Sequence, residues 1–304
     1  MAMYENERNV MQLLNFLRPA NPEVAKEFPT ALEEYACKRG DLNLYLLISR
    51  RHANMRVLDY RIGNYQLKRN MLDKLAKQKG LKKIFTLVEK QDSNSWRTVG
   101  FSREAVVPAY FRTADAYVMS RVYDEKGDAL TGGLSKVAVI HEIEEPKEPK
   151  KPNGLKLYVL DDIDDLQHLV MREDTTPVYA PFGKGIRHPE IAICAKVGRK
   201  EHWIVAETND SFGHAKIDIL NPPTNDREVG ACVYGILELF EYLLEMDMSN
   251  CFTFVSVEEP LMNEVFGQAG FRHTGQMTRH MTFDDRESAL DLHVWHKRLR
   301  SHKP

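Results

Sequence analysis

One short stretch of this chain has the residue pattern best suited to bind a charged ligand. Arg227-Glu228-Val229-Gly230-Ala231-Cys232 follows a run that we expect to form a strand and precedes a run that we expect to form a helix. Backbone N–H groups at a helix start have no partners within the helix, and the helix dipole makes that end positive. A phosphate binds there readily when a small residue lets the backbone come close. Gly230 is that small residue, so the sequence predicts an anion-binding loop.

The elements that would position this loop are those of a strand–helix–strand unit. Residues 214–220 are expected to form a central strand, 230–245 a long helix with an apolar face, and 251–257 a second strand. The alternative is an ordinary unit of this kind without a ligand. In that case Gly230 only eases the packing of the helix start.

A similar order of elements occurs earlier in the chain. The run Phe85-Thr86-Leu87-Val88 followed by Gly100-Phe101 resembles Phe252-Thr253-Phe254-Val255 followed by Gly270-Phe271. Such an internal repeat indicates two related α/β units. The first has Arg61-Ile62-Gly63-Asn64-Tyr65 where the second has its anion loop, so we expect a degenerate first unit without a cofactor.

Composition places the boundary between the units at 140–154, where mixed charge and three prolines favour extended chain or a surface loop with docked ends. We expect a degenerate unit over 51–139 and a complete unit over 155–304. Residues 1–50 are expected to be a helical extension, with one helix over 29–39. Within it, 42–49 is either a strand or a buried helical turn.

Composition also excludes several classes of protein. The 304 residues are 43% apolar and 28% charged, as in a soluble globular protein, and the net charge of -2 gives no attraction to nucleic acid or acidic membranes. The N-terminus lacks the apolar block of a signal peptide, and no apolar run approaches the ~20 residues of a membrane helix. The four cysteines lack C-x-x-C spacing, so we expect neither disulfides nor a metal site. We therefore expect a cytoplasmic protein.

The stretch around the loop resembles the acetyl-CoA-binding core of the GNAT N-acetyltransferase superfamily. The family's loop reads Arg/Gln-x-x-Gly-x-Gly/Ala, and Arg227-x-x-Gly230-x-Cys232 departs from it at Cys232. This resemblance implies an α/β (α+β) fold of two GNAT-like mixed-sheet units. The second unit would be complete, with a splayed central sheet flanked by helices.

The two-unit plan is also similar to that of β-lysine N-acetyltransferases, in which a short unit without the CoA loop precedes a complete GNAT domain. The long N-terminal extension is a departure from them. The segments that carry this resemblance are KKIFTLV (82–88), PAYF (108–111), DAYVMSRVYD (115–124) and DLHVWHKRL (291–299).

The resemblance implies acetyl-CoA as cosubstrate and assigns roles to particular residues. The pantetheine arm would lie between the strands 214–220 and 251–257, along the backbone of Ile219 and Leu220. The pyrophosphate would bind at 227–232.

Acetyl transfer to an amine also needs the ammonium to lose a proton before attack. Asp218, at an acidic position of the family, is the first candidate base; Glu207 is the second, His214 the third, and water can serve instead. Phe266 stands where the family places a Tyr that protonates the leaving thiolate, and Phe cannot donate a proton.

Two functions from different classes follow. The first is an N-acetyltransferase that acts on a small amine, such as a β-lysine-like amino acid. The second is a non-catalytic GNAT-like protein that binds CoA or a protein partner. Phe266 and Cys232 favour the second, whereas Arg227 and Gly230 favour CoA binding. We expect a small-molecule amine as partner, no nucleic acid and no membrane, and a homodimer is an open option.

Overall fold

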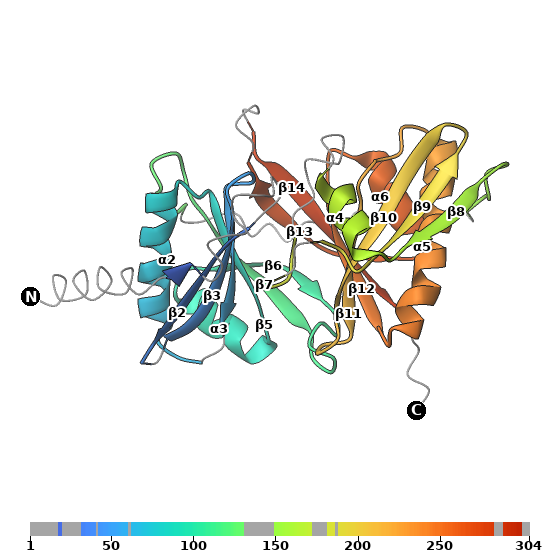
Figure 1. Ribbon diagram of the computed structural model, residues 1–304. Helices are drawn as coiled ribbons and strands as arrows, with labels where there is room; N and C mark the ends of the chain where they lie inside the picture. The colour runs from blue at the N-terminus through green and yellow to red at the C-terminus, as the bar shows by residue number, and fades with distance from the viewer. Residues whose placement is uncertain are drawn as a thin grey trace, which may run out of the picture. The chain divides into compact units, whose positions relative to one another are not determined.

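The structure is a computed structural model of the chain (Figure 1). It describes residues 18–19, 32–40, 42–59, 62–130, 149–171, 181–185, 188–282 and 288–299. The chain divides into two compact units. Unit 1 consists of Met1–Ala105, Ala116–Lys136 and Thr278–Leu290, and unit 2 of Val106–Asp115, Val137–Met277 and Asp291–Pro304. Val106–Asp115, from the first half of the chain, thus belongs to unit 2, and Thr278–Leu290, from the second half, belongs to unit 1.

Unit 1 is a mixed sheet with two described helices. Its strands are β1 (Arg18–Pro19), β2 (Glu33–Arg39), β3 (Leu42–Ser49), β4 (Asn54–Asp59), β5 (Lys83–Val88), β6 (Ser102–Val107) and β7 (Ala116–Val122). They lie in the order β1-β2-β3-β4-β5-β7-β6. Helix α2 (Tyr65–Lys79) joins the parallel strands β4 and β5, and α3 (Lys90–Thr98) follows β5. The parallel pair needs such a crossover because its two strands run in the same direction.

The expectation of a helix over 29–39 is wrong for the described residues of that range. Strand β2 pairs antiparallel with β3 from Glu33↔Ile48 to Arg39↔Leu42, and β3 settles the ambiguity at 42–49 in favour of a strand. Local residue preferences allow a helix here, but burial of Cys37 and of most of β3 in the unit 1 core outweighs them. The other residues of the predicted helical extension before 32, apart from 18–19, lie outside the described residues.

Unit 2 is a second mixed sheet, with helices on both faces (Figure 1). Its strands are β8 (Lys156–Leu160), β9 (Ile191–Val197), β10 (Lys200–Asn209), β11 (His214–Ile219), β12 (Asn250–Ser256), β13 (Arg272–Met281) and β14 (Leu290–Arg298), in the order β13-β14-β12-β11-β10-β9-β8. Helices α5 (Asp226–Glu245) and α6 (Pro260–Gln268) pack together in the main apolar core, whereas α4 (Ile163–Met171) packs in a smaller cluster with Val205 and Leu220.

The two units share one order of elements. In unit 1 the order along the chain is β2-β3-β4-α2-β5-α3-β6-β7, and in unit 2 it is β9-β10-β11-α5-β12-α6-β13-β14. The first unit therefore includes strands from residues that we expected to form a helical extension.

The likeness extends to the turn after the second helix of each unit. Phe101 N donates to Trp96 O at 3.1 Å, and Phe271 N donates to Phe266 O at 3.0 Å. In both turns the Gly before the Phe has positive φ, 89° at Gly100 and 81° at Gly270. A long basic side chain covers each glycine, since a Cβ would meet Arg121 Nη1 at 2.5 Å in unit 1 and Lys297 Nζ at 2.6 Å in unit 2. The same turn geometry thus accounts for the Gly-Phe pair in both units.

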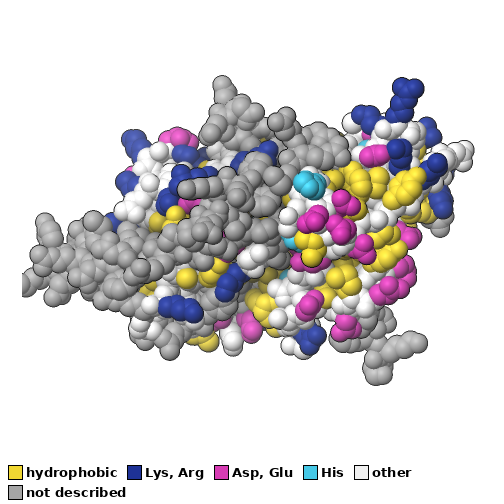
Figure 2. All heavy atoms as spheres, viewed as in Figure 1, with side chains coloured by type: hydrophobic (Ala, Val, Ile, Leu, Met, Phe, Trp, Pro, Cys, Tyr) yellow, Lys and Arg dark blue, Asp and Glu magenta, His cyan; other side chains and the backbone are white. Residues whose placement is uncertain are grey.

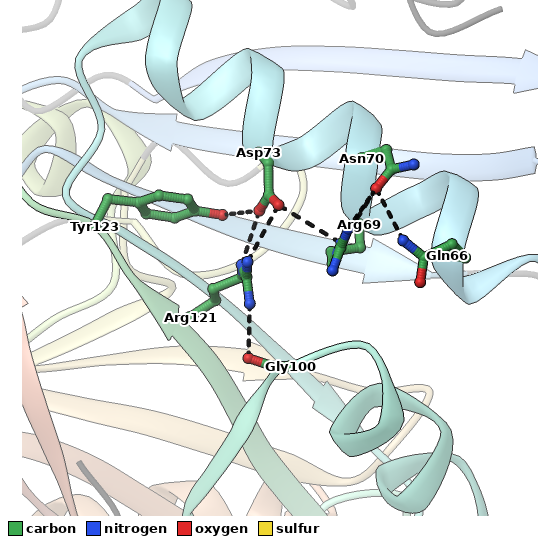
Figure 3. Close-up of polar contacts among 7 residues, drawn as sticks. All are labelled: Gln66, Arg69, Asn70, Asp73, Gly100, Arg121 and Tyr123. Carbon is green, nitrogen blue, oxygen red and sulfur yellow. Dashed lines mark hydrogen bonds and ion pairs between the residues drawn. The ribbon is translucent and has the colours of Figure 1, made fainter. Parts of the chain in front are cut away.

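A polar network holds the same turn of unit 1 against its first helix (Figure 3). Asp73 on α2 accepts from Arg121 Nε at 2.8 Å and from the Tyr123 hydroxyl at 2.7 Å, and Arg121 Nη1 donates to Gly100 O at 2.9 Å. Burial and the adjacent Asp73 carboxylate raise the pKa of Tyr123 well above its usual value. Tyr123 therefore stays a neutral hydrogen-bond donor, and the network joins α2, β7 and the glycine turn.

The segment Thr278–Leu290 is anchored in unit 1 by a buried ion pair. Lys83 Nζ contacts Glu104 at 2.7 Å, and both side chains are almost fully buried. Lys83 also donates to Thr278 O at 2.6 Å, and Glu104 accepts from the Thr278 hydroxyl at 2.6 Å. A buried pair needs such extra hydrogen bonds to offset its desolvation, so Thr278 is tied to unit 1 by this polar network.

No helix within the described ranges is long and apolar enough to cross a membrane. The cysteines are free and buried. Among the residues with a defined placement, no cluster of three or more His, Cys, Asp or Glu could hold a metal ion.

Candidate functional site

The central feature of unit 2 is a pair of parallel strands that separate. Strands β11 and β12 pair at His214↔Asn250, Ala215↔Cys251 and Lys216↔Phe252, and in these fully described strands the pairing ends there. On their outer sides β11 stays paired with β10 to Ile219, and β12 stays paired with β14 to Ser256. Beyond Lys216 and Phe252, the inner edges of β11 and β12 therefore no longer pair with each other.

The direction of the hydrogen bonds tells which backbone groups face this gap. Leu220 N donates to Trp203 O on β10 at 2.8 Å. Alternate residues of an antiparallel strand turn their backbone groups to opposite sides, so Ile217 and Ile219 turn theirs toward β12. The expectation for Ile219 fits this geometry. We also expect the Leu220 backbone to face this gap. That expectation is wrong for the Leu220 N–H, because it donates to β10.

Beside the gap, one face of β10 and β11 carries three charged side chains. Glu207 lies directly opposite Lys216, and Val205 directly opposite Asp218, so Glu207, Lys216 and Asp218 share a face. Lys216 forms an ion pair with Asp218, and both side chains are mostly buried. The fold thus brings the first two candidate bases together, with a lysine next to both.

Glu207 is the more deeply buried of the two acids. Its side chain is 3% exposed, and Oε2 accepts the N–H of Phe182 at 2.8 Å and of Gly183 at 3.3 Å. Burial raises the pKa of Glu207 to about 7, with Lys216 opposing and Asp218 adding to the effect. A carboxylate with such a pKa can accept and release a proton near neutral pH.

The predicted anion loop is helical in the structure. Helix α5 begins at Asp226, so residues 227–232 form its first turns and the loop is 221–225 instead. The Asn225 side chain caps the helix by accepting from Glu228 N at 3.1 Å. The Glu228 carboxylate turns back to accept from Thr224 N at 2.8 Å and from its hydroxyl at 2.9 Å. Burial alone would raise the pKa of Glu228, but these hydrogen bonds prevail and lower it.

The structure gives Gly230 and Arg227 a packing role. A Cβ on Gly230 would lie 2.8 Å from Lys150 O and 3.1 Å from Pro152 Cγ. Arg227 Nη2 donates to Asn153 O at 2.9 Å. The chain segment just before β8 therefore lies against this side of α5. The close approach that Gly230 permits is to the protein's own backbone, in agreement with the packing alternative.

The other residues of the predicted loop face the core. Val229, Ala231 and Cys232 are fully buried in the cluster beneath α5. Burial raises the pKa of the Cys232 thiol, so it stays protonated. Phe266 is fully buried as well and packs edge-on against Phe271 at 5.1 Å. Within 227–232, the N–H groups of Glu228 and Val229 donate to Asn225, and residues 230–232 lie inside the helix. The backbone N–H and the exposed side chain of Arg227 are therefore the candidates for binding an anion.

Sequence reasoning missed one element of this region, the segment Val106–Asp115. His214 Nδ1 lies 2.8 Å from Tyr110 O, the two rings stack at 4.1 Å, and Tyr110 also meets Phe252 edge-on at 5.7 Å. Ala109 and Arg112 have positive φ of 49° and 67°, which is rare for residues with a side chain. Tyr110 thus packs where β11 and β12 are still paired. No local pattern predicts a contact between residues this far apart in sequence.

Unit 1 provides an internal comparison. Arg56 pairs with Leu47 and Phe85, just as Lys216 pairs with Glu207 and Phe252. By the same register the position of Asp218 holds Leu58. Both acids of unit 2 are therefore leucines in unit 1.

The helix start of unit 1 differs as well. Asn64 precedes α2 in a left-handed conformation and makes no side-chain cap. One turn into α2, the fully buried Lys68 forms an ion pair with Asp59 at 2.7 Å. The start of α2 therefore differs in conformation and capping from the start of α5.

No family model and no curated protein matches this chain. Solved structures that resemble part of it include a spermidine/spermine N-acetyltransferase from Vibrio cholerae, with TM-score 0.36 and 14% identity over 48% of this chain and 92% of that one. The ribosomal-protein-S18-alanine N-acetyltransferase from Escherichia coli gives TM-score 0.36 and 11% identity over 49% and 98%. A putative acetyltransferase from Salmonella typhimurium, solved with acetyl-CoA, gives 0.32 and 13% over 38% and 67%. At these scores the comparisons support no statement about individual residues.

Proposed function

We propose that unit 2 is an N-acetyltransferase that moves an acetyl group from acetyl-CoA to a small amine. The observation that carries the proposal is the separation of β11 from β12 beside the buried Glu207. A gap edged by strand backbone suits an extended ligand with amide groups, because such a ligand replaces the missing strand pairing. A carboxylate with a pKa of about 7 next to that gap suits proton removal from an ammonium.

The backbone of Ile217 and Ile219 would bind the pantetheine amides of acetyl-CoA. The first turn of α5 would bind the pyrophosphate through its N–H groups and the helix dipole. We retain Arg227 to Cys232 as the proposed pyrophosphate site. Its binding groups would be the N–H and side chain of Arg227, because Glu228 N and Val229 N already donate to Asn225. The cosubstrate supplies the activated acetyl thioester, and the residues of the chain supply position and proton transfer.

Glu207 would accept the proton from the substrate ammonium, and Asp218 would hold the ammonium by charge. Lys216 lies opposite Glu207 and in an ion pair with Asp218, which keeps a cation between the two acids. Glu207 therefore becomes the first candidate base, whereas the sequence alone favours Asp218. The buried Phe266 offers no proton for the leaving thiolate, so the proposed reaction releases CoA as the thiolate.

The acceptor that we propose is a small amine that also carries a carboxylate, as a β-lysine-like amino acid does. Acidic and basic side chains on one face of β10 and β11 suit such a substrate. The resemblance of the two-unit plan to β-lysine N-acetyltransferases supports the same choice.

The alternative is a protein that binds CoA, or a protein partner, without catalysis. The Glu228 carboxylate favours it, because it already occupies the Thr224 N–H and hydroxyl at the start of α5. The buried Phe266 also favours it, because Phe cannot protonate the leaving thiolate.

One experiment separates the two functions. The full chain is titrated with acetyl-CoA by calorimetry and then incubated with acetyl-CoA and a panel of small amines, with free thiol and acetylated products measured by mass spectrometry. The proposal predicts saturable binding and acetylation of at least one amine. Binding without transfer to any amine supports the alternative, and absence of binding contradicts the proposed transfer.

A further inference from the structure

Strand β8 forms an edge of the unit 2 sheet. It pairs antiparallel with β9 from Lys156↔Lys196 to Leu160↔Ala192. It is also the last strand in the order, so within the described part of the chain its other edge has no partner strand. An unpaired edge presents a row of N–H and C=O groups on which another strand can pair.

The side chains of β8 lack the usual protection of an edge. Tyr158 is 49% exposed and Val159 is 39% exposed, and consecutive residues of a strand point to opposite faces. Ile163, at the start of α4, is 58% exposed. Native edge strands avoid a flat apolar edge by carrying Lys, Pro, a bulge or inward charges. The strand KLYVL has a Lys at its first position only, with neither Pro nor a charge among the four residues that follow, so this apolar part is suited to pair with another strand.

The charges on either side of β8 indicate what covers it. Lys150, Lys151 and Lys156 precede or open the strand, whereas Asp161, Asp162, Asp164 and Asp165 follow it. In Figure 2, hydrophobic side chains on the visible face of unit 2 lie next to acidic ones, with basic side chains toward the right-hand edge of the view. A second β8 in antiparallel orientation brings the basic start of each strand to the acidic end of the other. A parallel copy would bring like charges together.

We propose that β8 pairs with β8 of a second copy of this chain, antiparallel and about a two-fold axis at Val159. This register places Val159 opposite Val159, Tyr158 opposite Leu160, and Lys156 opposite Asp162 of the second copy. The contact is isologous, so each favourable charge pair occurs twice. A strand of five residues makes a short interface. The dimer therefore forms in a concentration-dependent way, independently of the proposed activity.

The register gives a direct crosslinking test. In a Val159→Cys variant the two new thiols face each other across the axis, within the ~4.4–6.8 Å Cα separation that a disulfide spans. The native cysteines are all buried and do not compete. Lys156→Cys is the matched control, because its two copies would lie ~20 Å apart along the strands. Under mild oxidation we expect a disulfide-linked dimer of Val159→Cys only. A monomer for Val159→Cys, or equal crosslinking of both variants, overturns the proposal.

Sedimentation equilibrium over a range of protein concentrations tests the charge argument. We expect the wild type to dimerise and Lys156→Glu to require a several-fold higher concentration. Lys200→Glu, at the exposed start of β10, makes the same change in net charge and should dimerise as the wild type does. Equal weakening by both substitutions, or a wild type that is monomeric at all concentrations, contradicts pairing through β8. Far-ultraviolet circular dichroism confirms that each variant is folded.

Discussion

Glu207 and Lys216 lie directly opposite each other on β10 and β11, and the equivalent pair in unit 1 is Leu47 and Arg56. At this position of the strand pairing, a carboxylate therefore faces an ammonium group in unit 2, and a leucine side chain faces a guanidinium group in unit 1. Both units have a basic residue on the second strand, Lys216 or Arg56, whereas only unit 2 has an acid opposite it. This difference places the candidate proton acceptor in unit 2 alone.

The first prediction concerns Glu207 as the base. Glu207→Gln keeps the shape of the side chain and an acceptor for the N–H groups of Phe182 and Gly183, but it cannot take a proton. We expect acetyl transfer to fall ~10²–10⁴-fold, the usual loss for one positioned base. The wild-type rate should rise with pH and level off above about 7, the pKa of Glu207.

Glu190→Gln is the matched control for this prediction. Glu190 is also an acid with a raised pKa; it is partly buried and accepts from Thr208 N at 2.8 Å. It has no assigned role in catalysis, so its loss should leave the maximal rate nearly unchanged. The pH profile should shift only slightly to lower pH, because the Glu190 charge is the smallest of the effects on the pKa of Glu207. Equal losses in both variants would argue that Glu207 acts through folding.

The second prediction concerns stability and pH. Burial raises the pKa of Glu207 from 4.5 to about 7, so between these values the folded protein holds a proton that the unfolded chain has released. The stability from this group is therefore fully present below pH 4.5 and is lost as pH rises through 7. Relative to the wild type, Glu207→Gln should gain up to about 3 kcal/mol between pH 4.5 and 8. Urea unfolding at both pH values measures this, and a gain that is independent of pH would contradict the burial of an ionisable group.

The third prediction uses two glycines that lie inside helices. Gly230→Ala places a Cβ 2.8 Å from Lys150 O, whereas Gly267→Ala meets its nearest atom, in Trp295, at 4.0 Å. Both substitutions gain helix propensity of about 1 kcal/mol. We expect Gly267→Ala to raise the melting temperature. Gly230→Ala should lower it and speed tryptic cleavage after Lys150, because the segment before β8 must move. Unchanged cleavage in Gly230→Ala would show that this segment does not depend on Gly230.

The fourth prediction concerns Tyr110. Its ring stacks on His214 and meets Phe252, although it comes from the first half of the sequence. Tyr110→Ala should destabilise unit 2 by about 3–5 kcal/mol, as expected for loss of a buried aromatic side chain. Tyr110→Phe keeps the ring and the carbonyl group and should cost less than about 1.5 kcal/mol.

A fragment of residues 155–304 extends this prediction, because it lacks Val106–Asp115 altogether. It should unfold at a lower temperature than unit 2 in the full chain and should bind a dye specific for exposed apolar surface. A fragment as stable as the full chain would contradict the role of Tyr110.

The sequence alone was sufficient for strands whose pattern is strongly apolar. The strands predicted over 214–220 and 251–257 occur as β11 (His214–Ile219) and β12 (Asn250–Ser256), each within one residue of the predicted bounds. The helix predicted over 29–39 failed because the conformation of β2 depends on pairing with β3. The start of α5 was misplaced by several residues because Asn225 was not recognised as its cap.

The candidate site could be predicted only in part, for a related reason. Glu207 and Asp218 were found as acids on neighbouring strands. The raised pKa of Glu207, however, comes from burial, and the N–H of Phe182, which lies far away in sequence, opposes it. The packing of Gly230 against Lys150 likewise depends on tertiary contact. Residue type and spacing give no information on such contacts.

The central claim is that acetyl-CoA binds between β11 and β12, and hydrogen exchange of backbone amides tests it most directly. Exchange is followed by mass spectrometry on the full chain, with and without saturating CoA. The account predicts slower exchange in peptides that cover Ile217 and Ile219 and the first turn of α5, with no change in the equivalent strand β4 of unit 1. Protection of β4, or saturable CoA binding without protection of β11, would contradict it.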